Sequence, residues 1–347
     1  DLVHLYRDRL GILPLYYYRD ENKFVFASEI KALLVAIGEM PSIDKQSLVD
    51  YLGQRGVPAP NTLYEGIKKL EPGHHLTVST NGKVKNEAWY TIPTGIEIDE
   101  DHTLESASTQ LDRKLYGAVE AALVADVPVG AYLSGGIDSS LICAMISKIR
   151  GGGKNTLSTF AAKFSDGSSL DETPFAKTVS DMLGTDHHEV NVSPKDFIET
   201  WPKLTYQFDA PIPEPPDIAF SYLAKKAREH VTVVLSGEGS DELFGGYPKY
   251  QYANLVNKLS KIPYFARKPI FKTIEKMLPA SMNRQRTLVR AASQRNEIES
   301  FKTWFAPFTS AETREMFDAQ SHDTLEEIHK HSRGDVLHRM SYVDLHS

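Results

Sequence analysis

The sequence contains a single cysteine, Cys143, among its 347 residues. One cysteine excludes an internal disulfide and a metal site built from several cysteines. The sequence also lacks any apolar run that approaches the roughly 20 residues of a membrane-spanning helix, and we expect no secretory leader. These absences predict a protein without membrane association that resides in the reducing cytoplasm.

An excess of positive charge is also absent. The chain has 39 Lys and Arg residues against 46 Asp and Glu residues, which gives a net charge of −7. Proteins that bind nucleic acid generally carry a basic surface, so no nucleic-acid partner is expected. Basic residues do gather between Lys258 and Arg290, and we interpret them as the solvated face of helices.

The length predicts two domains or one large domain, and residues 1–92 are predicted to form the first. This part is β-rich, with short runs of β-forming residues at 2–6, 15–18 and 23–26. The Asn81-Gly82 pair predicts a hairpin, and Ser28 is the expected N-cap of a helix that reaches Val35. A polar, proline-marked stretch at about 91–101 predicts a linker.

Residues 98–347 are predicted to form an α/β domain with a helical extension. Buried strands alternate with amphipathic helices, which indicates right-handed βαβ units and a parallel sheet. Both faces of Val231–Leu235 are apolar, so this strand is expected at the centre of the sheet. After residue 250 the chain is mostly helical, with predicted breaks at Pro263, Pro269 and Pro279. The predicted strands are 127–133, 156–164, 188–192 and 231–235, and the predicted helices are 104–124, 139–149, 172–183 and 218–229.

The segment Ser134–Ser140, with the sequence SGGIDSS, follows the first of these strands and opens a helix. Glycines let the backbone approach an anion, and serine hydroxyls with the free N–H groups of a helix start donate to it. The lysine of a Walker loop is missing. A pyrophosphate-holding loop, with Asp138 placed for Mg²⁺, therefore fits cleavage between the α and β phosphates of a nucleotide.

A second polar loop, Ser236–Asp241, follows the strand Val231–Leu235. Ligands of open α/β sheets bind beyond the carboxyl ends of the strands, so the two loops are expected to face one nucleotide. Asp138 and Asp241 would then be two hard oxygen ligands for phosphate-bound Mg²⁺.

Several motifs resemble known proteins. Ser134–Ser140 is similar to the pyrophosphate loop of the N-type ATP pyrophosphatases. The segment Leu235–Tyr247, LSGEGSDELFGGY, resembles the second signature of glutamine-dependent asparagine synthetases, and Leu183–Glu189 resembles a further motif of that family. Near the start, Arg7–Tyr17, RDRLGILPLYY, resembles part of their glutaminase domain.

This resemblance implies a parallel-sheet ATP pyrophosphatase domain with a helical extension, preceded by part of a β-rich α+β amidohydrolase domain. It implies a ligase that amidates aspartate through β-aspartyl-AMP, with ammonia from glutamine and with ATP and Mg²⁺ as cofactors. Its partners would be these small molecules, and a homodimer is left open. Glu238, Asp138 and Asp241 would be catalytic, and Asp138 and Asp241 would hold the metal. The nucleotide would be bound by Leu133, Ser134, Gly135, Gly136, Asp138, Ser139, Ser140, Ala162, Ser236 and Gly237.

Parts of the family pattern are missing or changed. The family's glutaminase uses an N-terminal cysteine, whereas Cys143 is expected inside a helix as a small buried residue. We therefore expect a piece of a longer protein, with glutaminase elements before Asp1 and a basic segment of the synthetase site after Ser347. Lys163 stands where the family usually has glycine, and Ala210 stands where it commonly has glutamate.

Two alternatives remain open. The acceptor could be a carboxylate other than aspartate, since β-lactam-forming synthetases and other amidotransferases share these loops. The protein could instead be a degenerate nucleotide-binding or regulatory module, although the intact Asp138, Glu238 and Asp241 argue against this. The adjacent His187 and His188 should diverge on a strand, so we predict no metal shared between them.

Overall fold

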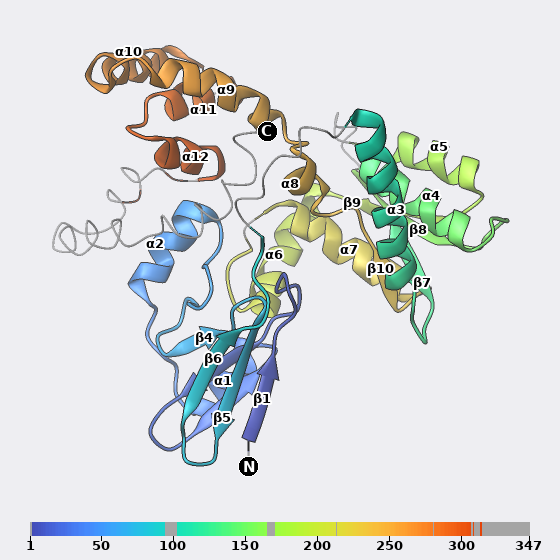
Figure 1. Ribbon diagram of the computed structural model, residues 1–347, viewed down its shortest axis with the longest axis horizontal. Coiled ribbons are helices and arrows are strands. Elements are labelled where there is room, and N and C mark those ends of the chain that lie inside the picture. The colour runs from blue at the N-terminus through green and yellow to red at the C-terminus, as the bar shows by residue number, and fades with distance from the viewer. Residues whose placement is uncertain are drawn as a thin grey trace. The chain divides into compact units, whose positions relative to one another are not determined.

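The computed structural model describes residues 2–93, 103–164, 171–212, 214–279, 281–306, 308 and 313. These fall into two compact units (Figure 1). One unit comprises residues 1–97, 208–210 and 248–347, and the other comprises 98–207 and 211–247. Most of the predicted linker at 91–101 and the end of the helical extension lie outside the described residues. The domain boundaries at 92 and 98 stay a prediction.

The first unit contains two three-stranded antiparallel sheets. In one, β1 (Leu2–Tyr6) pairs with β5 (His74–Ser79), which also pairs with β6 (Val84–Ala88). In the other, β2 (Tyr16–Arg19) lies between β3 (Phe24–Ala27) and β4 (Ile67–Lys69). The three strands predicted in the first 30 residues and the hairpin at Asn81-Gly82 are thus confirmed.

The helix α1 (Ile30–Ile37) begins later than predicted, and Ser28 is not its N-cap. Glu29 occupies the N-cap position without a side-chain hydrogen bond. Instead, Oδ2 of Asp209 accepts from the Ile30 N–H at 2.7 Å, and the same carboxylate pairs with Lys31. A cap supplied from 179 residues away leaves no local sequence signal.

A second helix, α2 (Lys45–Gln54), follows, capped by the Asp44 carboxylate, which accepts from the Ser47 N–H. After residue 247 the described residues of this unit form four helices (Figure 1). The expected break at Pro269 is wrong, because this proline lies inside a helix. The four helices are α9 (Pro248–Ser260), α10 (Tyr264–Met277), α11 (Asn283–Ala292) and α12 (Glu297–Phe305).

The second unit is built on a four-stranded parallel sheet in the order β10-β7-β8-β9. The strands are β7 (Val129–Tyr132), β8 (Ser158–Phe164), β9 (Asp186–Val192) and β10 (Val233–Leu235). The predicted α/β class and parallel sheet are confirmed. The central position predicted for Val231–Leu235 is wrong, because β10 pairs with β7 alone among the described strands and Val233 is 38% exposed.

Helices cover both faces of this sheet (Figure 1). On one face α3 (Leu104–Ala122), α4 (Ile137–Ile149) and α5 (Thr173–Leu183) enclose a core that includes Leu133, Ile146 and Ala161. On the other face α7 (Pro216–Arg228) packs its Leu223 and Ala227 on Phe160. The helix α6 (Pro194–Phe208) contributes Leu204 to a smaller core with Ile218 of α7. Alternate residues of each strand therefore face different helices.

Among the described residues, no helix combines the length and the apolar character needed to cross a membrane.

Candidate active site

A cavity of about 580 Å³ opens where β7, β8 and β10 reach their carboxyl ends. Its walls include the loop after β7, the loop after β10, the start of α5 and one face of α7. This is the edge of a parallel sheet at which ligands bind. Most of the residues predicted to bind nucleotide line it, namely Leu133, Ser134, Gly136, Asp138, Ser139, Ala162, Ser236 and Gly237, together with Glu238 and Asp241.

The loop after β7 is held by its own serines. Oγ of Ser134 lies 3.0 Å from Oγ of Ser139, which also accepts from the Ser134 N–H at 3.2 Å. The Gly136 N–H donates to Oγ of Ser134 at 3.2 Å. The loop is therefore ordered by bonds that do not depend on a ligand.

The helix α4 begins directly at this loop. Its N-cap, Gly136, has no side chain and makes no cap hydrogen bond, so the first-turn N–H groups lack a side-chain acceptor at that position. Free amide donors, the positive end of the helix dipole and two serine hydroxyls together favour an anion. This observation fits phosphate at the position predicted from the sequence.

Gly135 and Ser140 do not line the cavity, in contrast to their neighbours. Gly135 has a φ of +86°, and a Cβ on it would come within 2.4 Å of the Ala176 N atom at the start of α5. The glycine thus allows the loop to pack on α5. Oγ of Ser140 is buried and has no hydrogen-bond partner among the described residues.

The loop after β10 touches the first loop. A Cβ on Gly237 would lie 2.9 Å from the Ser139 N atom and 3.0 Å from Cβ of Asp138. Gly237 also accepts a hydrogen bond, through its carbonyl oxygen, from Oγ of Ser240 at 2.9 Å. The two polar loops therefore form one continuous surface, as their positions after neighbouring parallel strands predict.

Acidic side chains gather on this second loop. Burial, with the neighbouring carboxylates of Glu242 and Asp241, raises the pKa of Glu238 above its ordinary value. Glu242 accepts from the Tyr247 hydroxyl at 2.7 Å, and Gly246 lies so close to the Asp241 carboxylate that a Cβ there would overlap it. A carboxylate cluster beside an anion-binding loop has the hard oxygen donors that Mg²⁺ prefers.

The apolar and α5 walls of the cavity were not predicted from the sequence. Phe160 and Phe164 come from β8, Phe220 from α7 and Phe197 from α6. Glu172 and Thr173, at the start of α5, add polar atoms. A hydrophobic helix face such as that of α7 gives the same sequence signal whether it faces the core or a cavity, so only the fold identifies these residues.

The two positions at which the sequence departs from the family pattern lie outside the cavity lining. Lys163 pairs with Glu189 at 3.7 Å and is absent from the cavity lining. Ala210, the residue after the Asp209 that caps α1, is also absent from the cavity lining. Cys143 is fully buried in α4 as predicted, and burial raises its pKa to about 12.

The fold and the site define an α/β protein with a phosphate-type loop and a carboxylate cluster at the carboxyl edge of a parallel sheet. The family model for asparagine synthase matches residues 110–347, and that for a glutamine amidotransferase domain matches residues 1–90. The chain belongs to the asparagine synthase family.

Curated relatives carry names of two kinds. Asparagine synthetase [glutamine-hydrolyzing] 1 of Bacillus subtilis is 33% identical over 83% of this chain and 44% of its own length. Putative asparagine synthetase [glutamine-hydrolyzing] 2 of Methanocaldococcus jannaschii is 34% identical over 77% of this chain and 51% of its own. Amidase chry2 of Gibberella zeae is 33% identical over 72% of this chain and 38% of its own length. The chain spans about half the length, or less, of these relatives.

A solved glutamine-dependent NAD+ synthetase from Acinetobacter baumannii, in complex with ADP, superposes with a TM-score of 0.29. The two sequences are 14% identical, and the match covers 90% of this chain and 68% of the NAD+ synthetase chain.

Proposed function

We propose that the protein containing this chain forms an amide by activating a carboxylate with ATP, with aspartate as the acceptor and glutamine as the source of ammonia. The observation that carries the proposal is the contact of Gly237 with Asp138 and Ser139. It unites a phosphate-type loop and a carboxylate cluster on one cavity, as adenylation requires.

In this proposal the nucleotide lies across both loops. Leu133, Ala162, Ser236 and Gly237 frame the adenine, next to the apolar wall. Ser134, Gly136 and Ser139, with the start of α4, hold the pyrophosphate portion. Gly135 supports them by permitting the loop to pack on α5, and Ser140 contributes a buried hydroxyl behind the loop.

Asp138 and Asp241 are the proposed Mg²⁺ ligands. Both line the cavity, and the acidic side chains of Glu238 and Glu242 lie on the same lining. Bound Mg²⁺ would neutralise charge on the departing pyrophosphate. Without a cation, so many carboxylates beside a phosphate site would repel the nucleotide.

The chemistry follows in two steps. A carboxylate oxygen of the acceptor attacks the α-phosphorus, the bond to the bridging oxygen breaks, and pyrophosphate leaves. Ammonia then attacks the acyl carbon, AMP leaves with the oxygen, and a proton passes to solvent. The residues of the chain would position the reactants and stabilise developing charge. Glu238, which lines the cavity, would contact the acyl group or the amine.

The remaining expectations belong to the whole protein. Glutamine hydrolysis would occur in the domain to which residues 1–90 belong. A cytoplasmic location and a homodimer stay predictions. Fractionation of cells and sedimentation of the purified protein test them.

The second candidate is a carboxylate acceptor other than aspartate, and one observation favours it. The sequence identity to Amidase chry2 of Gibberella zeae is 33%, the same as the identity to asparagine synthetase 1 of Bacillus subtilis. The loops that contact ATP would serve any carboxylate acceptor.

The test is a pyrophosphate-release assay on the full-length protein with ATP, Mg²⁺ and ammonia, against a panel of carboxylates. Stimulation by aspartate supports the proposal. If aspartate caused no pyrophosphate release and another carboxylate did, that carboxylate would be the acceptor instead of aspartate. ATP binding without turnover on any carboxylate would favour the regulatory module instead.

A further inference from the structure

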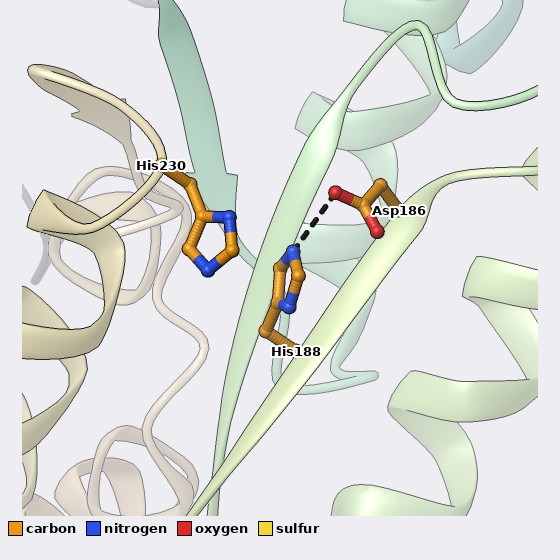
Figure 2. Close-up of side chains that lie close together, drawn as sticks. All are labelled: Asp186, His188 and His230. Carbon is orange, nitrogen blue, oxygen red and sulfur yellow. Dashed lines mark hydrogen bonds and ion pairs between the residues drawn. The ribbon is translucent and has the colours of Figure 1, made fainter.

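Three potential metal ligands meet at the beginning of β9, away from the cavity (Figure 2). Asp186 and His188 lie two positions apart on this strand, so their side chains share one face of the sheet. His230 comes from the turn that follows α7. One ligand atom from each of the three residues lies within 4.8 Å of the others.

The packing of α7 on the sheet brings His230 to this position. The ring of His230 stacks on the ring of His188, with centroids 3.9 Å apart and planes inclined by 29°. Phe160, on the neighbouring strand β8, contacts both rings at centroid distances of 5.4 and 5.9 Å. The two imidazoles are therefore supported by the same buried side chain.

The carboxylate fixes the orientation of the central imidazole. Nε2 of His188 lies 2.9 Å from Oδ2 of Asp186, as the dashed line in Figure 2 shows. His187 turns to the opposite face, where Nδ1 lies 2.8 Å from Oγ1 of Thr159. The predicted divergence of the two adjacent histidines is thus confirmed, and it directs His188 toward His230.

We propose that Asp186, His188 and His230 bind a divalent transition-metal ion, and that Zn²⁺ is the ion they fit. Two imidazole nitrogens and one carboxylate oxygen form a common set of protein ligands for Zn²⁺. A fourth, solvent-facing position remains for water, since the Asp186 side chain is 45% exposed. The proposal is independent of the proposed synthetase function.

Only a local adjustment is needed to bind the ion. Metal–nitrogen distances of about 2.0–2.1 Å in a tetrahedron place ligand atoms roughly 3.3 Å apart. The Asp186–His188 pair, at 2.9 Å, is close to this spacing. His230 is exposed on a turn, and its ring would leave its stacked position on His188 to reach the ion. Ligation through Nε2 of His188 requires the tautomer with its proton on Nδ1, and any further proton leaves to solvent.

The site is distinct from the cavity at the other end of the sheet. Asp186 is the first residue of β9, whereas the nucleotide loops follow the last residues of their strands. None of the three residues lines the cavity. A bound ion would join the end of α7 to β9, and its binding free energy would stabilise this unit.

The experiment is a titration of the metal-free 347-residue chain with Zn²⁺ against a chromophoric chelator, in millimolar Mg²⁺ to occupy the carboxylates of the cavity. We expect one equivalent of Zn²⁺ to bind and His230→Ala to weaken its affinity by at least ~10-fold. His75→Ala is the matched control, since the His75 ring also stacks on a histidine, His4, but in the other unit. It should leave the affinity unchanged.

A second readout identifies the ligands directly. In ¹⁵N spectra of the imidazoles, Zn²⁺ should shift the resonances of His188 and His230 and leave that of His187 in place. Uptake of no Zn²⁺, or uptake that is unchanged by His230→Ala, would overturn the proposal. His230→Ala removes an exposed side chain, and circular dichroism verifies that the variant is folded.

Discussion

Gly237 lies against Asp138, so closely that a Cβ on the glycine would be 3.0 Å from Cβ of the aspartate. The two residues are about a hundred positions apart in sequence. Gly237 lies in the loop after β10, and Asp138 lies in the first turn of α4, which follows the loop after β7. Their contact closes the gap between the phosphate-type loop and the acidic loop. A side chain at position 237 would have to separate the two loops.

Replacing this glycine should therefore disrupt the site. Gly237→Ala places a methyl group against backbone and Cβ atoms that cannot rotate away, and we expect pyrophosphate release to fall on the order of 10²-fold. Gly117→Ala is the matched control, because Gly117 lies in α3 with open space around it. This control should keep full activity and be slightly more stable. Equal activity of both variants would contradict the account.

The two proposed metal ligands should be individually essential. Asp138→Asn and Asp241→Asn each remove a negative oxygen donor without changing size, and we expect at least ~10²-fold slower pyrophosphate release, whether ammonia or glutamine is supplied. Asp181→Asn, at an exposed position of α5 paired with Lys177, serves as the control. A variant with near-normal turnover at saturating Mg²⁺ would remove that aspartate from the assignment.

The raised pKa of Glu238 predicts a pH-dependent effect on stability. A folded-state pKa above the unfolded value means that protonation favours the folded state, and this contribution is lost as pH rises through the folded pKa. Without metal, Glu238→Gln should therefore raise the melting temperature at about pH 7. The gain should vanish near pH 4, below the ordinary glutamate pKa.

Glu229 provides the control of opposite sign. Its hydrogen bond and charge interaction with Lys226 lower the pKa of Glu229, so its ionised form stabilises the fold above the ordinary pKa. Glu229→Gln should not raise the melting temperature at about pH 7. A Glu238→Gln variant that melts below the parent there would contradict the inferred direction.

Cys143 should be inert in the folded chain. Burial raises its pKa to about 12, so the thiolate that reacts is scarce, and we expect alkylation near pH 8 to be at least ~10³-fold slower than in the denatured chain. Since it is the only cysteine, the rate reports one site. The 347-residue chain should also release no glutamate from glutamine. Glutamate release that is lost in Cys143→Ala would contradict this account.

The sequence was most informative where local pattern and fold agree. The strands β7, β8 and β9 and their helices follow from apolar periodicity, and the loop at Ser134–Ser140 follows from glycine, serine and aspartate at a strand end. The edge position of β10 could not be predicted, because a short apolar strand has the same sequence pattern at the centre and at the edge of a sheet.

Other features depend on partners that are distant in the sequence. Asp209 caps α1 across 179 residues, and no pattern near Ser28 reveals this. Pro269 remains inside α10, although an isolated helix would favour a break there. The aromatic wall of the cavity and the cluster of Asp186, His188 and His230 likewise require the packing of α7 on the sheet.

The position at which ATP is cleaved tests the central claim most directly. The full-length protein would be incubated with α-³²P-labelled ATP, Mg²⁺, aspartate and ammonia, and the labelled product separated. A phosphate-type loop without a Walker lysine, beside a carboxylate cluster, predicts labelled AMP and an equal amount of pyrophosphate, dependent on aspartate. Labelled ADP with orthophosphate would contradict the account.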